Sequence, residues 1–320
     1  MKLLISELGA WSRYVSREFF HTMNALIADH GWKHIEAHCV HGQPGKVAGI
    51  LRDRFGELPS VILFWEAYHV FPTIFTDLLD LHCRKCVFTD DLHSFDDVSR
   101  VTKELTLTYS DTIISTYAYQ LNDFFPALRG LRKKIVWSPH AASPEFLLPF
   151  NRHPEDLVLL SGNLNDCYPL RQHVKSLHDS AGYPIVHQPH PGYGCHHDYA
   201  GDSAIGSNFA AAIQQRRAAL ADPPYRYLVA KYFEIPATGS LLLAGTEVAR
   251  EMKQLGFEDN VHYVGVSRAD VAEKIRYAVS PDNYAEIDAI RRRGQALVWE
   301  RHTTVHRARA IDYACQEVRA

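Results

Sequence analysis

Short apolar runs alternate with amphipathic stretches along the first half of the chain. A helix over residues 17–30 is predicted from apolar positions that recur on one face. The apolar runs predict strands at residues 2–6, 34–39, 60–65, 85–89, 112–115 and 134–137. Strands that alternate with helices indicate a parallel sheet covered on both faces. We therefore expect residues 1–150 to form one doubly wound, Rossmann-like α/β domain.

A stretch with four prolines and no periodicity, residues 138–154, interrupts this pattern and predicts a linker. The alternation then resumes. It predicts strands at residues 156–161, 184–187, 218–221, 240–244 and 261–264, and helices at residues 169–179, 208–217, 227–237 and 248–255. The chain is helical from residue 268, with a new helix start at Pro281. We expect a second Rossmann-like domain over residues 151–300 and a helical segment over residues 301–320.

The composition argues against a nucleic-acid-binding, membrane-spanning or secreted protein. The 320 residues include 34 Lys and Arg against 37 Asp and Glu, which gives a net charge of -3 and no basic excess for a nucleic-acid partner. The most apolar stretch, residues 60–81, is interrupted by charged residues and a proline, so we expect no membrane span. Glu7 falls too early for the apolar core of a secretory signal. We expect a cytoplasmic protein.

The six cysteines are scattered, which does not indicate a disulfide framework. Cys83 and Cys86 form a lone C-x-x-C, and two interpretations stay open for it. It is either a metal or redox pair, or two ordinary half-buried thiols.

Residues 225–244 carry the most informative pattern. Lys231 and Glu234 are three apart and share a helix face, Gly239 suits a left-handed helix end, and Ser240 opens an apolar run. A carboxylate on such a helix suits a pair of sugar hydroxyls, and the helix start with nearby Arg or Lys suits a diphosphate. The alternative is an exposed Lys–Glu pair before an ordinary helix end.

This segment resembles the nucleotide-sugar site of glycosyltransferases with the GT-B architecture, and it is similar to the family-1-type transferases related to the CgeB spore-maturation protein. One motif, F-E-x-x-A-x-G, is matched from Phe233 to Gly239. A second, W-x-P-H-A, is matched from Trp137 to Ala141, and a third, G…Y-P-x-R, runs from Gly162 to Arg171. The resemblance spans residues 135–263 at the level of motifs.

The resemblance implies two facing Rossmann-like domains, with the last helices returning to the first domain. It implies an enzyme that moves a sugar from a nucleoside diphosphate sugar to a hydroxyl of a glycan, glycolipid or small molecule. The donor binds the C-terminal domain and the acceptor binds the N-terminal domain. Many retaining members have a second Glu eight positions before the one matched by Glu234, where this chain has Arg226, so the anomeric outcome is not carried over.

The candidate donor site combines the matched motifs with neighbouring residues. After the strand ending at residue 161, a Gly-Asn turn either brings backbone N–H groups to a phosphate, with Arg171 as a clamp, or is an ordinary tight turn. Arg226 is a further candidate for the donor phosphates. The candidate donor residues are Gly162, Asn163, Tyr168, Arg171, His190, Tyr193, Arg226, Lys231, Glu234, Gly239 and Ser240.

The stretch from His187 to His197 is rich in histidine and has three interpretations. It is a zinc site that includes Cys195, a solvated loop, or a loop that covers the donor, with Tyr193 stacking and His190 bonding a phosphate or hydroxyl.

Candidates for acceptor binding and for the general base follow predicted strands of the first half. His93, with Asp91 or Asp90 beside it, suits proton transfer near neutral pH, and Glu66 follows the strand before it. The alternative for this segment is a polar helix start. The candidate catalytic residues are His93, Asp91 and Glu66, and the candidate acceptor residues are Trp11, Asp90, Tyr117 and His140.

No D-x-D segment is present, so we expect no metal and no cofactor, with positive side chains and helix ends stabilising the leaving diphosphate. Three competing functions stay open: a nucleotide-sugar epimerase on the same fold, a non-catalytic sugar- or nucleotide-binding module, and a zinc hydrolase that uses the His-rich loop.

Overall fold

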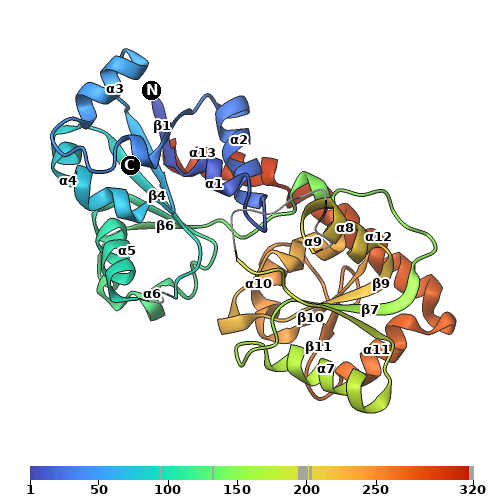
Figure 1. Cartoon of the computed structure of the whole chain (residues 1–320). Coiled ribbons are helices and arrows are strands. Elements are labelled where there is room, and N and C mark those ends of the chain that lie inside the picture. The colour runs from blue at the N-terminus through green and yellow to red at the C-terminus, as the bar shows by residue number, and fades with distance from the viewer. Residues whose placement is uncertain (94–95, 132, 194–200, 202–203, 317–320) are drawn as a thin grey trace. The chain divides into compact units, whose positions relative to one another are not determined.

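Contacts between residues divide the chain into two units, which are drawn in Figure 1. The computed structural model describes residues 1–93, 96–131, 133–193, 201 and 204–316. The first unit comprises Met1–Ser12, Phe20–Pro139 and Val305–Ala320, and the second comprises Arg13–Phe19 and His140–Thr304. The predicted boundaries lay near residues 150 and 300, and no pattern in the sequence had indicated that residues 13–19 join the second unit.

The first unit is built on a parallel sheet with the strand order β2-β1-β3-β4-β5-β6. Its strands coincide closely with the predicted apolar runs, because both faces of the sheet are covered and each strand needs apolar residues on both sides. They are β1 (Lys2–Ser6), β2 (Lys33–Glu36), β3 (Val61–Trp65), β4 (Arg84–Thr89), β5 (Thr112–Ser115) and β6 (Lys134–Trp137). The predicted strand at residues 34–39 is too long, since a 3-10 turn at Ala37–Cys39 ends it.

The helices of the first unit connect these strands and include one from the end of the chain. They are α1 (Leu8–Trp11), α2 (Glu18–His30), α3 (Val47–Phe55), α4 (Phe71–Asp80), α5 (Asp97–Tyr109), α6 (Leu121–Phe124) and α13 (Thr304–Gln316). The α13 side chain of Asp312 accepts hydrogen bonds from Lys2 Nζ at 2.7 Å and Trp32 Nε1 at 2.8 Å. These bonds attach α13 to β1 and to the residue before β2.

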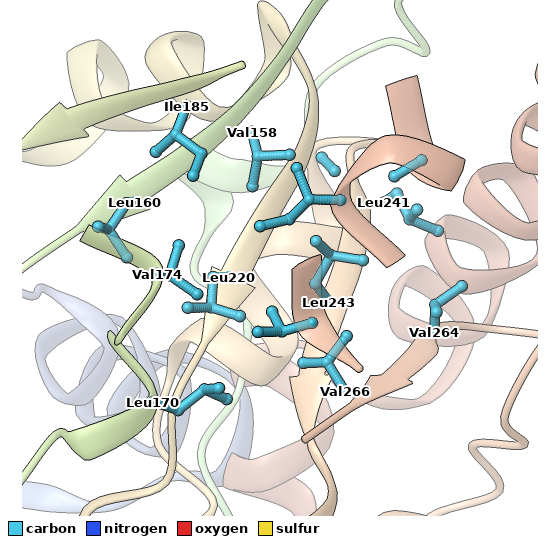
Figure 2. Close-up of a cluster of buried hydrophobic side chains, with 14 of the residues drawn as sticks. Val158, Leu160, Leu170, Val174, Ile185, Leu220, Leu241, Leu243, Val264 and Val266 are labelled. Carbon is cyan, nitrogen blue, oxygen red and sulfur yellow. The ribbon is translucent and has the colours of Figure 1, made fainter. Parts of the chain in front are cut away.

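The second unit repeats this plan with the strand order β11-β10-β9-β7-β8, again all parallel. Its strands are β7 (Glu155–Ser161), β8 (Ile185–Gln188), β9 (Arg216–Ala221), β10 (Leu241–Gly245) and β11 (Val264–Val266). Every residue of β10 is buried, and Figure 2 shows Leu241 and Leu243 among the buried side chains of β7, β9 and β11. This cluster is the hydrophobic core on one face of the sheet.

Helices cover both faces of the second sheet, with α7 and α11 on one side and α8 and α9 on the other in Figure 1. The helices are α7 (Pro169–Ala181), α8 (Gly206–Gln214), α9 (Lys231–Ala237), α10 (Ala249–Gln254), α11 (Val271–Val279) and α12 (Tyr284–Arg301). The predicted doubly wound α/β class is therefore confirmed for both units. Among the described residues, no helix combines the length and apolar character needed to cross a bilayer.

Three predicted boundaries in the second unit are wrong. The helix predicted at residues 208–217 ends at Gln214, because Arg216 and Arg217 already belong to β9. The helix predicted from residue 227 begins only at Lys231, since Tyr225 and Arg226 before it are left-handed. The strand predicted at residues 261–264 begins at Val264, because the preceding residues form a turn closed by the Asp259 side chain.

The proline-rich segment at residues 138–154 connects the units but is not an exposed linker. His140, Ala141 and Ala142 are buried in the second unit. The Ala142 N–H donates to the His302 carbonyl at 2.9 Å, and the Thr304 N–H donates to the Ala142 carbonyl at 3.2 Å. The segment is thereby attached to the chain that follows α12.

Both sheets reverse their strand order at one point, between β1 and β3 in the first unit and between β7 and β9 in the second. Open parallel sheets bind ligands beyond the carboxyl ends of the strands at such reversals. The residues that follow these strands are therefore the ones that position a site.

Candidate functional site

Gly162 follows β7 at the strand-order reversal of the second unit, and two cations lie against it. Its φ is +106°, and a Cβ there would lie 2.7 Å from Arg171 Nη1 and 3.0 Å from Lys231 Nζ. Both side chains are held by the same turn, since Arg171 Nη1 donates to the Asn163 carbonyl at 2.7 Å and Lys231 Nζ donates to the Ser161 carbonyl at 3.0 Å. Only glycine allows this approach.

Arg171 is held in place from several sides. Its backbone N–H donates to Asp222 Oδ2 at 2.8 Å, and its guanidinium carbon lies 3.8 Å from the centroid of the Tyr168 ring. The residue is 3% exposed, and its Nε has no acceptor within the described part of the chain. Neither Arg171 nor Lys231 forms an ion pair with a carboxylate of the described residues. The turn therefore brings together two basic side chains that no acid in this part of the chain pairs with by contact.

Lys231 and Glu234 lie on α9, as predicted, but the alternative of an exposed pair is wrong. Glu234 is 6% exposed, and burial raises its pKa to about 7. Burial, with the charge of Arg171, lowers the pKa of Lys231 to about 7. No described side chain or backbone group hydrogen-bonds to the Glu234 carboxylate. The carboxylate is therefore available to accept hydrogen bonds from a ligand.

Gly239 and Ser240 are not brought to this turn. Gly239 has φ +78° and ends α9 as predicted, but its carbonyl accepts from the α12 residue Arg291 at 2.8 Å. Ser240 Oγ donates to the Arg216 carbonyl at 2.9 Å, at the amino end of β9. Both residues therefore lie at the opposite edge of the sheet from Gly162.

A buried cluster near Glu234 was missed in the sequence. Glu18 Oε1 accepts the Ala141 N–H at 2.7 Å, and Glu18 Oε2 lies 2.6 Å from His140 Nδ1. The Phe19 ring stacks on the His140 imidazole with a centroid distance of 5.7 Å. Glu18 and His140 both act electrostatically on Glu234, Glu18 raising its pKa and His140 lowering it. His140, predicted to bind the acceptor, therefore lies in the second unit with the candidate donor residues.

The loop after β9 is connected to the loop after β7. Tyr225 and Arg226 have φ of +51° and +62°, which is rare for residues other than glycine. The Tyr225 hydroxyl lies 3.1 Å from Cys167 Sγ, two residues after Asn165 in the loop that begins at Gly162. Arg226 is exposed on this strained turn.

The His-rich stretch is described only in part. His190 Nδ1 accepts the Gly192 N–H at 2.9 Å, and the His190 and Tyr193 ring centroids are 4.3 Å apart. The Tyr193 side chain is 64% exposed. Cys195, His196 and His197 lie outside the described residues. Among the residues that are described, no group of three His, Cys, Asp or Glu is arranged to hold a metal ion.

In the first unit a cavity of about 280 Å³ lies at the carboxyl ends of β3 and β4. It brings together the three predicted catalytic residues with six that the sequence analysis missed. The lining residues are Glu66, Tyr68, His69, Asp91, His93, Asp96, Ser99, Thr102 and Lys103. Acids, imidazoles and a cation thus share one small volume.

Glu66 is the most constrained residue of this cavity. Its φ of +52° is strained for a side chain of this size. Its Oε1 accepts the Tyr68 hydroxyl at 2.9 Å and the Asp90 N–H. Burial raises the pKa of Glu66, and the charge of Lys103 opposes that shift. The Thr116 hydroxyl donates a hydrogen bond to Asp90 Oδ1 at 2.6 Å.

His93 lies beside Asp91 and Lys103. Its Nδ1 is 4.0 Å from Asp91 Oδ1. Burial lowers the pKa of His93, and so does the charge of Lys103. The Lys103 ammonium donates to the Asp91 carbonyl and lies 4.7 Å from the centroid of the Tyr68 ring. A lowered pKa keeps the imidazole neutral near pH 7, which is the form that accepts a proton.

The other two acceptor candidates do not line this cavity. Tyr117 is buried, and its N–H donates to Ser115 Oγ at 3.1 Å. Trp11 is the last residue of α1 and is half-buried.

Residues 171–312 match the model of a family described as glycosyl transferase-like. The matched range contains Arg171, Lys231 and Glu234. No curated protein matches the chain significantly.

Several solved structures with a similar fold match over nearly the whole chain. An α-glucosyltransferase in complex with UDP-glucose and DNA containing an abasic site has a TM-score of 0.65 at 9% identity, covering 99% of this chain and 99% of that chain. Sucrose-phosphate synthase from Thermosynechococcus elongatus has a TM-score of 0.63 at 9% identity, covering 97% and 96%. Anabaena HepE in complex with UDP and glucose has a TM-score of 0.58 at 12% identity, covering 97% and 98%. The predicted GT-B fold is confirmed.

Proposed function

We propose that this protein transfers a sugar from a nucleoside diphosphate sugar to a hydroxyl of an acceptor. The match of residues 171–312 to a family model described as glycosyl transferase-like and the GT-B fold support this proposal. One observation carries the proposal. Arg171 and Lys231 converge on the backbone of Gly162 at the strand-order reversal, and no described carboxylate pairs with either. A diphosphate supplies the negative charge that this turn lacks.

The donor diphosphate binds against Arg171 and Lys231 in this proposal, and Glu234 accepts hydrogen bonds from the ribose hydroxyls. The buried Arg171 Nε gains the acceptor that the described chain does not provide. A bound diphosphate raises the pKa of Lys231 from about 7, because an adjacent negative charge favours the ammonium form. The two cations then stabilise the charge that develops on the leaving diphosphate as the glycosidic bond breaks. We propose that no metal ion is required for this step.

The acceptor binds in the first-unit cavity, where carboxylates and imidazoles suit hydroxyl groups. His93 takes the proton from the attacking acceptor oxygen, and the Asp91 carboxylate stabilises the imidazolium. Glu66 is the alternative base, since its pKa is raised toward neutral pH.

Two further features complete the proposal. We propose an acceptor other than nucleic acid, which the net charge of -3 supports, although three structures of the similar α-glucosyltransferase contain DNA. We also propose a cytoplasmic location. It is supported by the free thiols of Cys39, Cys83, Cys86, Cys167 and Cys315.

Thermal unfolding in the presence of UDP, GDP, CDP, ADP and their sugars tests the donor site. A ligand of the native state raises the apparent Tm, and we expect one nucleotide series to do so. Arg171→Ala and Lys231→Ala abolish that rise, whereas Lys175→Ala, an exposed-face control on α7 paired with Asp179, retains it. The donor site is rejected if no nucleotide raises the Tm of the wild-type protein.

Product analysis separates the competing functions. Incubation with the donor that binds and a panel of glycan and glycoside acceptors yields a glycosylated acceptor and free nucleoside diphosphate. An epimerase converts the donor sugar without any acceptor. A non-catalytic module binds the donor and leaves both compounds unchanged.

A further inference from the structure

Helix α5 of the first unit exposes four large apolar side chains. Val98 is 74% exposed, Val101 47%, Leu105 41% and Tyr109 50%. These residues are spaced by three, four and four positions, so they form one stripe along the helix. At 1.5 Å per residue the stripe is about 16 Å long. We call these four residues the α5 stripe.

Three polar residues of the same helix, Ser99, Thr102 and Lys103, line the cavity. Lys103 is buried and donates to the Asp91 carbonyl, while the buried Thr106 hydroxyl donates to the Thr102 carbonyl at 2.7 Å. Three polar residues of α5 therefore face the cavity, whereas four of its apolar residues are exposed to solvent.

The stripe and the cavity adjoin on the helix surface. Val98 and the cavity residue Thr102 are four positions apart, which makes them neighbours on one face. Scattered single apolar residues are normal on a protein surface, but an aligned set beside a polar cavity indicates a binding surface.

The charges that flank the stripe disfavour a bilayer as its occupant. Helices that lie on membranes are rich in Lys and Arg on their polar face. Here the flanking residues are Asp97, Arg100 and Glu104, and Arg100 Nη2 pairs with Asp97 Oδ1 at 3.6 Å. A single alkyl chain that continues from a ligand in the cavity needs no such basic face.

We propose that the acceptor is an amphiphile whose hydroxylated head group occupies the cavity and whose alkyl chain lies along the α5 stripe. This inference rests on the proposed function, since it names the acceptor class of that reaction. The apolar side chains of Val98, Val101 and Leu105 remove methylene groups from water, while the cavity residues bind the head group.

Alkyl glucosides of increasing chain length test the proposal. Binding of methyl, hexyl and octyl β-D-glucoside, each below its critical micelle concentration, is measured by calorimetry or ligand-observed NMR. Full burial of one CH₂ strengthens binding about fourfold, so even partial burial gives octyl glucoside an advantage of at least about tenfold over methyl glucoside. The double variant Val101→Ser/Leu105→Ser removes this advantage and leaves methyl glucoside binding unchanged.

Two further variants make the test specific. Val98→Ser, at the most exposed position of the stripe, reduces the advantage on its own. Val305→Ser, at a 54% exposed position on α13, preserves it. Helicity and Tm of each variant confirm that the exposed substitutions leave the fold intact.

Three results overturn the proposal. One is that octyl glucoside binds no more tightly than methyl glucoside, or that the variants of the α5 stripe do not change the difference in affinity. Another is a dimer in sedimentation that the double variant dissociates, which assigns the stripe to a second copy. The third is binding to phosphatidylcholine vesicles that octyl glucoside does not compete. Nucleotide-dependent Tm shifts on the same variants report the donor site separately, so failure of the proposed function is distinguished from failure of the acceptor class.

Discussion

The Gly162 turn of the second unit follows β7, whereas the cavity of the first unit lies beyond β3 and β4. Both lie at the carboxyl edge of a parallel sheet, yet their chemistry differs. At the turn, Arg171 and Lys231 lie on a glycine backbone and form no ion pair within the described chain. In the cavity, Glu66 accepts from Tyr68 and from the Asp90 backbone, and Lys103 donates to the Asp91 carbonyl. The turn has an excess of one sign of charge, whereas the cavity groups bond among themselves.

This difference shows that the fold determines where a site lies, whereas the side chains at that site determine its chemistry. Parallel strands deliver loops to one edge in both units, but the excess positive charge of the turn suits a diphosphate. The mixed acids and imidazoles of the cavity suit neutral hydroxyls and proton transfer.

His93→Ala gives the largest expected effect. Loss of a general base lowers a rate by ~10²–10⁴. We expect turnover at saturating donor to fall by this factor while nucleotide affinity is unchanged, because the second unit is untouched. His82→Ala, an exposed histidine of the first unit, leaves both quantities at the wild-type value.

Asp91→Asn refines the assignment of the base. A smaller loss than in His93→Ala means that Asp91 stabilises the imidazolium, and an equal loss means that Asp91 is itself the base. Wild-type turnover in both variants transfers the role to Glu66.

Glu234→Ala acts on the other region. Loss of a hydrogen bond to a charged group costs ~1.5–3 kcal/mol, so we expect donor affinity to fall by about 10- to 100-fold. Isothermal titration with the nucleotide identified by thermal unfolding measures this change. Glu300→Ala, at an exposed position of α12, is the matched control. An unchanged affinity in Glu234→Ala removes this residue from the donor site.

Gly162→Ala tests the close approach at the turn. A Cβ at φ +106° stores ~1–3 kcal/mol of strain and displaces both cations, so we expect lower stability and nucleotide affinity reduced by about tenfold. Gly182→Ala is the matched control, because Gly182 also has a positive φ but nothing lies within 4 Å of its Cβ position. We expect Gly182→Ala to lower the Tm and to leave nucleotide affinity unchanged. Equal affinity losses in both variants would mean that backbone strain alone explains the effect.

Strands such as β3 and β10 were predictable from the sequence because they are continuously apolar and buried on both faces. By contrast, β2 has one fully buried residue, and its predicted bounds were wrong. The β9 boundary was not predictable either, since Arg216 and Arg217 begin this strand and the Arg217 side chain pairs with Asp156 at 2.7 Å. Polar residues at the end of a strand are easily assigned to the preceding helix when the residue that they pair with is distant in sequence.

The candidate site was predictable where it depends on one position after a strand, as for Gly162, Glu66 and His93. It was not predictable where two distant segments meet. Glu18 and His140 are separated by 122 positions, and no local pattern connects them. Lys103 was missed because its helix exposes apolar residues and buries this cation, the reverse of the usual arrangement.

The Lys231–Glu234 pair predicts a pH dependence of stability in the unliganded protein. The pKa of Glu234 is raised from 4.5 to about 7, so the stability it contributes is present below pH 4.5 and is lost as pH rises to about 7. The pKa of Lys231 is lowered from 10.5 to about 7, so its contribution is lost as pH falls from 10.5 to about 7. The pair therefore produces a minimum of stability near pH 7.

Denaturant unfolding between pH 5 and 9 checks this minimum. Glu234→Gln flattens the acid side of the profile, and Lys231→Met flattens the alkaline side. The first-unit variant His93→Ala serves as reference and keeps the minimum. The assignment of two buried charges is contradicted if the stability of the wild-type protein has no minimum near pH 7. It is also contradicted if neither Glu234→Gln nor Lys231→Met changes the dependence of stability on pH.

Metal chelation is expected to have the smallest effect, namely none. Arg171 and Lys231 already place two positive charges where the diphosphate binds, so a divalent ion adds little to its stabilisation. Turnover in excess EDTA therefore equals turnover in Mg²⁺, and nucleotide affinity is the same in both. The Lys231→Met variant sharpens this test, because with one cation removed Mg²⁺ can restore part of the lost nucleotide affinity. Loss of wild-type activity on chelation, with recovery on addition of Mg²⁺ or Mn²⁺, would show that Arg171 and Lys231 do not suffice to stabilise the diphosphate. The excess positive charge would then not distinguish the turn from the acid-rich cavity.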